Sequence, residues 1–183
     1  MSFSDPIGES RISGYSGQAG VWRSPPITRL YLMKRRRSRE YALQILFQLD
    51  LTGGDFNEDV WNEFWEGNEE DDEVKEFTRD IVASTQKHIA EIDEAIKKAA
   101  EHWSIERMAV IDRNILRAAT YELLYRKDIP PSVVMNEALE IAKKYSTEES
   151  APFINGILDK IAHSEDKKKD TRKGGKSRGS GGV

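Results

Sequence analysis

Apolar residues recur at three- and four-residue steps through most of this chain, the spacing that gathers side chains on one face of an α-helix. The segments with this spacing are about 37–51, 60–65, 74–99, 104–123, 131–145 and 150–161. No segment alternates apolar and polar residues long enough to predict a β-strand. We therefore predict an all-α fold, a compact bundle of six to seven helices joined by short connections.

Residues that start or stop helices lie at the ends of these segments. Gly53-Gly54 ends the first predicted helix, and Pro131 is suited to start another because proline has no N–H to satisfy there. Ser104 is a candidate N-cap for the segment 104–123, and Ser150 for the last helix. The apolar spacing predicts a single helix of about seven turns over 74–99.

Glycine separates a central body from two ends. Nine of the 13 glycines lie in residues 1–32 or after residue 173, and these ends offer little apolar surface to offset the entropy of ordering. We predict a disordered extension over 1–33, a folded domain over 34–163 and a disordered basic tail over 164–183. Met33 is an alternative translation start, which would leave residues 1–32 outside the protein.

The small net charge of −4 hides an uneven layout. Residues 34–163 carry 18 basic and 27 acidic side chains, whereas 164–183 carry seven basic and three acidic ones. Within the body, 11 acidic residues lie between Asp55 and Glu76. The cations gather at the start of the body, as Lys34, Arg35, Arg36, Arg37 and Arg39. This asymmetry points to an anionic partner.

Catalytic and metal-binding patterns are not found in the sequence. There is no cysteine, and His88, His102 and His163 lie too far apart along the chain to form a zinc motif. The body has no glycine-rich phosphate loop and no serine elbow of the hydrolase type. We therefore expect neither an enzyme nor a bound cofactor or metal. The ends contain no long apolar run, so we expect a cytoplasmic protein.

The basic cluster is the strongest functional signal. Arg35 and Arg39 are four residues apart and share one face of a helix, with Arg36 beside them. Guanidinium groups suit phosphate contacts, and Tyr41 and Gln44 add stacking and hydrogen-bonding groups. The alternative is a solvated arm that only aids solubility. Cations at a helix N-terminus cost a few tenths to about 1 kcal/mol each, which favours a use for the charge.

Five segments, in order, resemble the NusB family of transcription antitermination factors. They are RRRSREYALQ (35–44), DRNILRAATYEL (112–123), DIPP (128–131), NEALEIAK (136–143) and FINGILD (153–159). The resemblance covers about Lys34 to Ala162 and implies a bundle of two helical subdomains. It also implies binding to single-stranded boxA RNA of ribosomal operons, together with the ribosomal protein NusE, on RNA polymerase. Whether the free protein is a monomer or a homodimer stays open.

The resemblance also assigns residues. RNA contacts fall on Lys34, Arg35, Arg36, Arg37, Arg39 and Gln44, and the NusE-facing surface falls on Phe47, Glu106 and Asp112. Other motif residues have structural interpretations: Asn136 would hydrogen-bond a neighbouring loop, and Gly156 would allow a close approach of two helices. Two further hypotheses are the accessory domain of an RNA-modifying enzyme and a pure protein-interaction scaffold.

Overall fold

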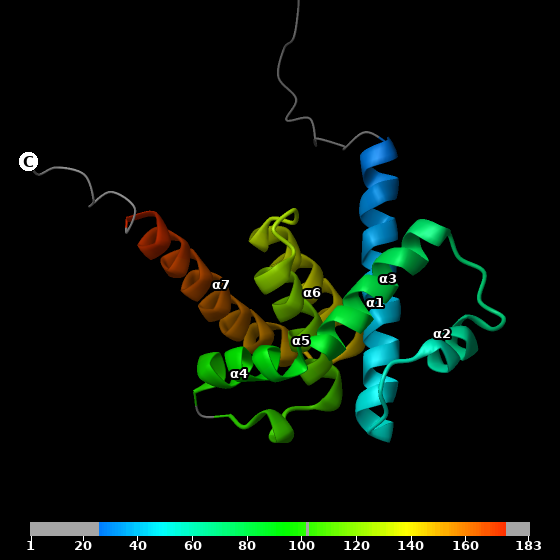
Figure 1. The fold of residues 1–183 in the computed structure, drawn as a ribbon, viewed down its shortest axis with the longest axis horizontal. Helices are drawn as coiled ribbons and strands as arrows, with labels where there is room; N and C mark the ends of the chain where they lie inside the picture. Colours follow the sequence, from blue (N-terminus) through cyan, green and yellow to red (C-terminus); the bar gives the residue numbers. More distant parts are fainter. Residues whose placement is uncertain (1–25, 102, 175–183) are drawn as a thin grey trace, which may run out of the picture.

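The computed structural model describes residues 26–101 and 103–174, all of whose regular elements are helices (Figure 1). In chain order they are α1 (Pro26–Thr52), α2 (Glu58–Trp65), α3 (Asp72–Lys87), α4 (Ile89–Ala100), the short 3-10 helix η1 (Ile105–Arg107), α5 (Val110–Tyr125), α6 (Pro131–Tyr145) and α7 (Ser150–Gly174). The predicted all-α bundle of six to seven helices is confirmed.

Helix α5 is the centre of the bundle. It packs against five other helices, α1, α3, α4, α6 and α7. The apolar stripes of all these helices meet in one contiguous core, in which Ile45, Ile81 and Leu116 are fully buried. Because each stripe follows the helical period, its burial holds the helices in fixed register around α5. The bundle therefore presents its ends and outer faces at set positions.

Both terminal helices extend past the bounds expected from the sequence. Helix α1 begins at Pro26 rather than near Lys34, and α7 continues to Gly174 rather than ending near His163. Pro26 occupies the first helical position, where its missing N–H costs nothing. The first turns of α1 project beyond the bundle (Figure 1), and Leu30 and Met33 stay exposed there. The predictions for residues 1–25 and 175–183 lie outside the described residues.

The prediction of one long helix over 74–99 is wrong. The helix breaks at His88, whose backbone leaves the helical region (φ −107°, ψ 17°), and α4 then runs in a new direction. Helices α3 and α4 both bury their stripes against α5, so the apolar spacing continues across the break. The His88 ring stacks on Tyr125 of α5, with 4.2 Å between ring centroids. This contact fixes the corner to α5.

Three smaller expectations also need correction. Ser104 precedes η1 and makes no side-chain cap bond, and α5 starts only at Val110. Gly156 is exposed, and a Cβ built on it would meet nothing within 4 Å, so close helix packing does not explain it. Asn136 is exposed rather than turned toward a neighbouring loop. Ser104, Asn136 and Gly156 therefore lie on the surface rather than between packed helices.

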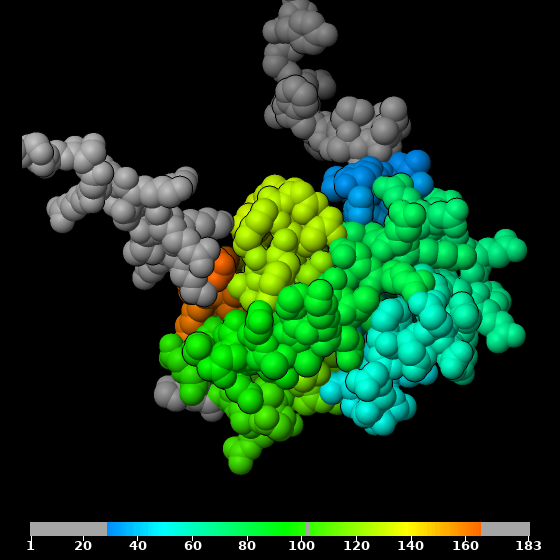
Figure 2. All heavy atoms as spheres, viewed as in Figure 1, coloured from blue at the N-terminus to red at the C-terminus, as the bar shows by residue number. Residues whose placement is uncertain are grey.

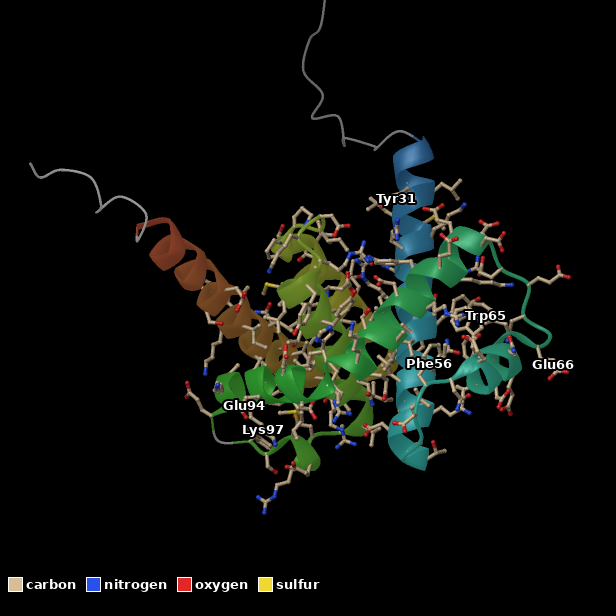
Figure 3. The ribbon with its side chains drawn as sticks, viewed as in Figure 1. Tyr31, Phe56, Trp65, Glu66, Glu94 and Lys97 are labelled. Carbon is tan, nitrogen blue, oxygen red and sulfur yellow. The ribbon has the colours of Figure 1, made fainter. Side chains whose placement is uncertain are left out.

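Helix α2 is attached differently from the others, because none of its residues is buried. Asn57 caps its start by accepting a hydrogen bond from the Val60 N–H at 3.0 Å. Aromatic rings then hold it by edge contacts: Trp65 lies 5.0 Å from Tyr41 of α1, and Trp61 lies 6.0 Å from Phe56 (Figure 3). This helix therefore rests on the outside of α1.

A buried ion pair joins α1 to α5. The Arg39 guanidinium donates two hydrogen bonds to the Glu122 carboxylate, Nε to Oε1 at 2.8 Å and Nη2 to Oε2 at 2.7 Å. Their side chains are only 7% and 2% exposed. Burying a charge is costly unless it is paired and hydrogen-bonded, and this bidentate geometry meets both conditions. The pair fixes the rotation of α1 against α5.

Replacing Arg39 by alanine should lower the free energy of unfolding by about 3–5 kcal/mol, because it leaves the Glu122 carboxylate buried without a partner. Urea denaturation followed by circular dichroism measures this. The control is Arg37→Ala, which removes an exposed arginine two residues before Arg39 on α1. This variant should change the free energy of unfolding far less. The double variant Arg39→Met with Glu122→Leu should recover much of the loss. A single-variant loss no greater than that of Arg37→Ala would contradict the structural role.

Candidate nucleic-acid interface

Four consecutive cations of α1, Lys34 to Arg37, form what we call the basic face. This part of α1 lies beside the start of α3 and the start of α6 (Figure 2). Each cation already has a carboxylate partner on a neighbouring segment. Lys34 Nζ lies 2.9 Å from Asp71 Oδ2, and Arg37 Nη2 lies 2.7 Å from Glu70 Oε2. These contacts hold the two side chains toward the α3 side of α1.

Arg36 faces the opposite neighbour. Its Nε and Nη2 donate to the two carboxylate oxygens of Glu137 on α6, at 2.9 and 2.8 Å. This hydrogen bonding raises the pKa of Arg36 above its usual value, so the guanidinium stays charged. Three of the five N–H donors of a guanidinium remain after such a bidentate pair. With a side chain that is 41% exposed, Arg36 can hold Glu137 and still contact an anion from solution.

Arg35 is packed on aromatic rings instead. Its guanidinium carbon lies 4.1 Å from the centroid of Phe77 on α3 and 4.9 Å from that of Tyr31, one turn earlier on α1. A weak ion pair to Glu73 spans 3.8 Å. The Arg35 Nε atom is buried and has no hydrogen-bond partner. Cation–π contacts of this kind fix the plane of the guanidinium without using its outer donors.

Arg39 does share a helix face with Arg35, as the spacing predicted, but that face is turned into the protein. Its guanidinium lies 5.3 Å from the Phe77 centroid and binds Glu122. The expected surface position of Arg39 is therefore corrected: the side chain is buried and supports the fold. Gln44 is exposed, as an RNA contact would require.

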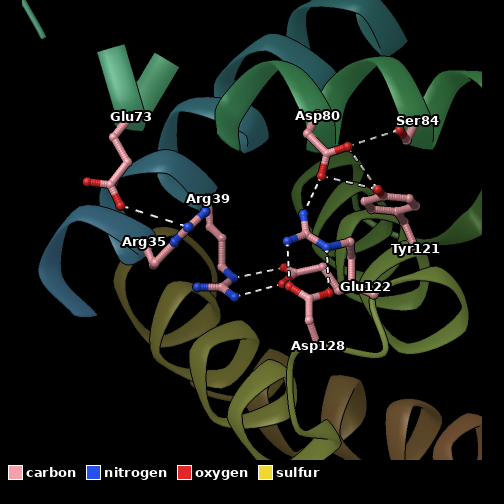
Figure 4. A network of polar contacts seen from close by, with 9 residues as sticks. Arg35, Arg39, Glu73, Asp80, Ser84, Tyr121, Glu122 and Asp128 are labelled. Carbon is pink, nitrogen blue, oxygen red and sulfur yellow. Dashed lines mark hydrogen bonds and ion pairs between the residues drawn. The ribbon is translucent and has the colours of Figure 1, made fainter. Parts of the chain in front are cut away.

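A second group of polar contacts lies close to this ion pair (Figure 4). Arg126 donates to Asp128 through Nε and Nη2, at 2.9 and 2.7 Å, and also to Asp80 on α3. The Tyr121 hydroxyl donates to Asp80 at 3.2 Å. The Arg126 guanidinium also lies 5.1 Å from the Phe77 centroid, so this one ring contacts three arginines. Sequence analysis missed Phe77, Arg126 and Glu137, because the contacts of Phe77 and Glu137 with arginines of α1, and of Arg126 with Asp80, form only in the folded chain.

The three residues expected to contact a protein partner differ in how exposed they are. Phe47 is half-buried on α1 and Glu106 is exposed on η1. Arg113 brings these regions together by donating to Asp50 on α1, Nε to Oδ2 at 2.9 Å, and to the Ile105 carbonyl at 3.3 Å. A surface that includes both Phe47 and Glu106 is therefore compatible with the fold.

Asp112 is not available for such a surface. It is 7% exposed, in the first turn of α5, and accepts hydrogen bonds from Ser146 Oγ at 2.6 Å and Ser150 Oγ at 2.8 Å. These contacts tie the start of α5 to the connection between α6 and α7. A carboxylate at a helix N-terminus is also favoured by the helix dipole. The expected partner contact is therefore corrected to a structural role.

The site offers binding rather than reaction chemistry. Within the described ranges, no three His, Cys, Asp or Glu residues are grouped so that they could hold a metal ion. No helix in the described part of the chain is both long and apolar enough to cross a bilayer. The basic face holds its cations in fixed positions on a rigid helix. An all-helical bundle with such a face belongs to the class of helical binding proteins.

Comparison with known proteins narrows this class. The model of the NusB family matches residues 36–163. The transcription antitermination protein NusB of Thermodesulfovibrio yellowstonii is 49% identical over 142 residues, covering 73% of this chain and 94% of that protein. The Myxococcus xanthus protein of the same name is 43% identical over 131 residues, covering 70% and 94%.

Solved structures agree with this match. A structure of T. maritima NusB superposes with a TM-score of 0.65 at 43% identity, covering 70% of this chain and 90% of that one. A crystal structure of the antitermination factors NusB and NusE in complex with dsRNA contains a chain with a TM-score of 0.65 at 31% identity, covering 72% and 98%. The chain belongs to the NusB family. It is a transcription antitermination factor and not an enzyme, as expected from the sequence.

Substituting Asp112 by alanine should lower the free energy of unfolding by about 1.5–3 kcal/mol, because two hydrogen bonds to a buried charged acceptor are lost and the hydroxyls of Ser146 and Ser150 keep only each other and Thr147 as partners. Glu106→Ala is the matched control, since this carboxylate is exposed and its removal should leave stability nearly unchanged. Chemical denaturation of both variants decides the matter. If both variants lost the same small amount of stability, the structural role of Asp112 would be refuted.

Acid should weaken the Arg126–Asp128 contact. Hydrogen bonding to Arg126 lowers the pKa of Asp128 to about 2, below its value of about 3.9 in an unfolded chain. A depressed folded-state pKa contributes stability that is complete above the unfolded value and is lost as pH falls toward 2. We expect Asp128→Asn to reduce the drop in melting temperature between about pH 4 and pH 2. If the melting temperature of Asp128→Asn fell with pH as much as that of the parent, Asp128 would contribute nothing to the acid dependence of stability.

Proposed function

We propose that this protein binds single-stranded RNA of the boxA type through the basic face and, with the ribosomal protein NusE, joins RNA polymerase in the cytoplasm to sustain transcription of ribosomal RNA operons. The observation that carries the proposal is the fixed row of cations at one end of α1. Family membership supports the partner classes, because a solved complex of relatives contains NusB, NusE and RNA, in that case double-stranded RNA.

Phosphates would contact the most exposed arginines first. Arg37 is 57% exposed and Arg36 is 41% exposed, and each has N–H donors that its carboxylate partner does not use. Lys34 adds a point charge, and Arg35 presents an edge of its stacked guanidinium. Arg39 contributes by holding α1 in place. Phosphate contacts of this kind set affinity and position rather than sequence preference.

Preference for particular bases requires neutral groups beside the cations. Tyr41 and Gln44 follow Arg37 by four and seven residues, so the three side chains lie on one side of α1. The Tyr41 hydroxyl is within 3.5 Å of Arg37 Nη2 and donates to Glu70 at 3.0 Å. Gln44 is exposed and has both a donor and an acceptor for a base edge. RNA would thus pass along this side of α1.

The NusE contact would use a separate surface around Phe47 and Glu106, near the other end of α1. The half-buried ring offers apolar area, and Glu106 offers a negative charge to a basic ribosomal protein. The acidic excess of residues 34–163 favours encounter with such a partner. Separation of the two surfaces would allow RNA and NusE to bind at once. If the free protein formed a homodimer through one of these two surfaces, binding of RNA or NusE to that surface would separate the dimer.

The double variant Arg36→Ala/Arg37→Ala should bind a boxA-like single strand more weakly. The dependence of log affinity on log salt concentration should also become shallower by up to about 1.4, since each lost phosphate contact to a single strand removes about 0.7. Fluorescence anisotropy at several salt concentrations, with and without NusE, measures both effects. NusE binding itself should persist, because the variant leaves Phe47 and Glu106 intact.

The matched control is Lys97→Ala/Lys98→Ala, which removes two cations from the exposed side of α4 (Figure 3). This control should leave affinity and salt dependence close to those of the parent. A scrambled RNA tests base preference in the same assay. If both double variants lose the same affinity, general charge rather than the basic face holds the RNA, and the proposal fails.

A further inference from the structure

A small groove lies next to the basic face, between the projecting turns of α1 and the start of α6. Tyr31, Leu32 and Arg35 form its α1 wall, and Ile129, Pro130 and Val133 line it from the other side. It encloses about 210 Å³. This is less than the roughly 300–1,000 Å³ of pockets that take a whole drug-sized ligand, so the groove suits a single flat group.

The α1 wall is apolar and open to solvent. Tyr31 is 48% exposed and Leu32 is 44% exposed, although both belong to an ordered helix. These turns precede residue 36, where the match to the family model begins. The Tyr31 ring carries the Arg35 guanidinium 4.9 Å from its centroid, and Arg35 in turn lies over Phe77. The ring is thus the outermost member of a stack that begins in the core.

Guanidinium groups border the groove, and each has more N–H donors than its carboxylate partner can accept from. Three arginines line it, Arg35, Arg39 and Arg126, and Arg36 lies beside it. The two carboxylates in its lining are already paired: Asp128 accepts from Arg126, and Glu137 accepts from Arg36. Arg35 Nε is buried there without a partner. An aromatic wall with a cationic border is the arrangement by which proteins hold unpaired bases on a phosphate backbone.

We infer that this groove receives one unpaired base of the bound RNA, stacked against Tyr31, while an adjoining phosphate lies on Arg36, the cation of the basic face that is held on the α6 side. The inference rests on the proposed RNA binding and extends its path past the N-terminal end of the basic face. A second copy of this chain is the competing occupant. It fits less well, because the groove is small and a second copy would bring its own cations to a cationic border.

The test uses the full chain with three single variants. Tyr31→Ala should weaken binding of a single-stranded RNA by at least about fivefold, the lower end of the stacking energies measured by alanine substitution. The salt dependence should not change, since no charge is removed. Tyr31→Phe keeps the ring and should bind like the parent. Met33→Ala, at an exposed apolar residue outside the groove, is the matched control and should also bind like the parent.

A fluorescent 2-aminopurine, placed in turn at each position of the RNA, gives a second measurement. One position should be quenched by the parent and by Tyr31→Phe, but not by Tyr31→Ala. Parent-like affinity of Tyr31→Ala would overturn the inference while leaving the proposed function standing. Absence of salt-sensitive RNA binding by the parent would instead defeat the proposed function itself. A change in sedimentation of Tyr31→Ala without a change in RNA affinity would assign the groove to a second copy.

Discussion

The arrangement of the basic face depends on the buried contact between Arg39 and Glu122. It joins α1 to the central helix α5, and the Phe77 ring packs against Arg39, Arg35 and Arg126 around it. A paired buried charge adds little net stability but strongly penalises any other rotation of the helix. The rotation of α1 decides which of its cations reach solvent. The buried position of Arg39 therefore determines that Arg36 and Arg37 reach solvent.

Carboxylates around the basic face both order it and compete with its ligand. Glu70, Asp71 and Glu137 hold three of the four cations at distances below 3 Å. Fixed side chains lose less entropy when a phosphate binds, which favours affinity. The same carboxylates repel phosphate, which lowers affinity for polyanions in general. Such a balance would favour a ligand that replaces these carboxylate contacts over one that brings only negative charge.

The fold could largely be predicted from the sequence, whereas the role of individual charged residues could not. Apolar spacing located the stripes that form the core, and Pro131 marked the start of α6 correctly. The break at His88 carries no glycine or proline and leaves the spacing intact, so no local signal revealed it. Arg39 and Asp112 look like surface residues in the sequence. Their burial depends on Glu122, Ser146 and Ser150, partners that only the tertiary structure brings near.

The attachment of α2 has a consequence for how the molecule opens. This helix has no buried residue of its own, although Val60, Trp61 and Phe64 pack against the edge of the core. Its release would uncover only that edge and should cost less than global unfolding. Its departure would free Tyr41 from the Trp65 ring, on the side of α1 where Arg37 and Gln44 lie. Opening of α2 would thus uncover the surface next to the cations while the other helices stay packed around α5.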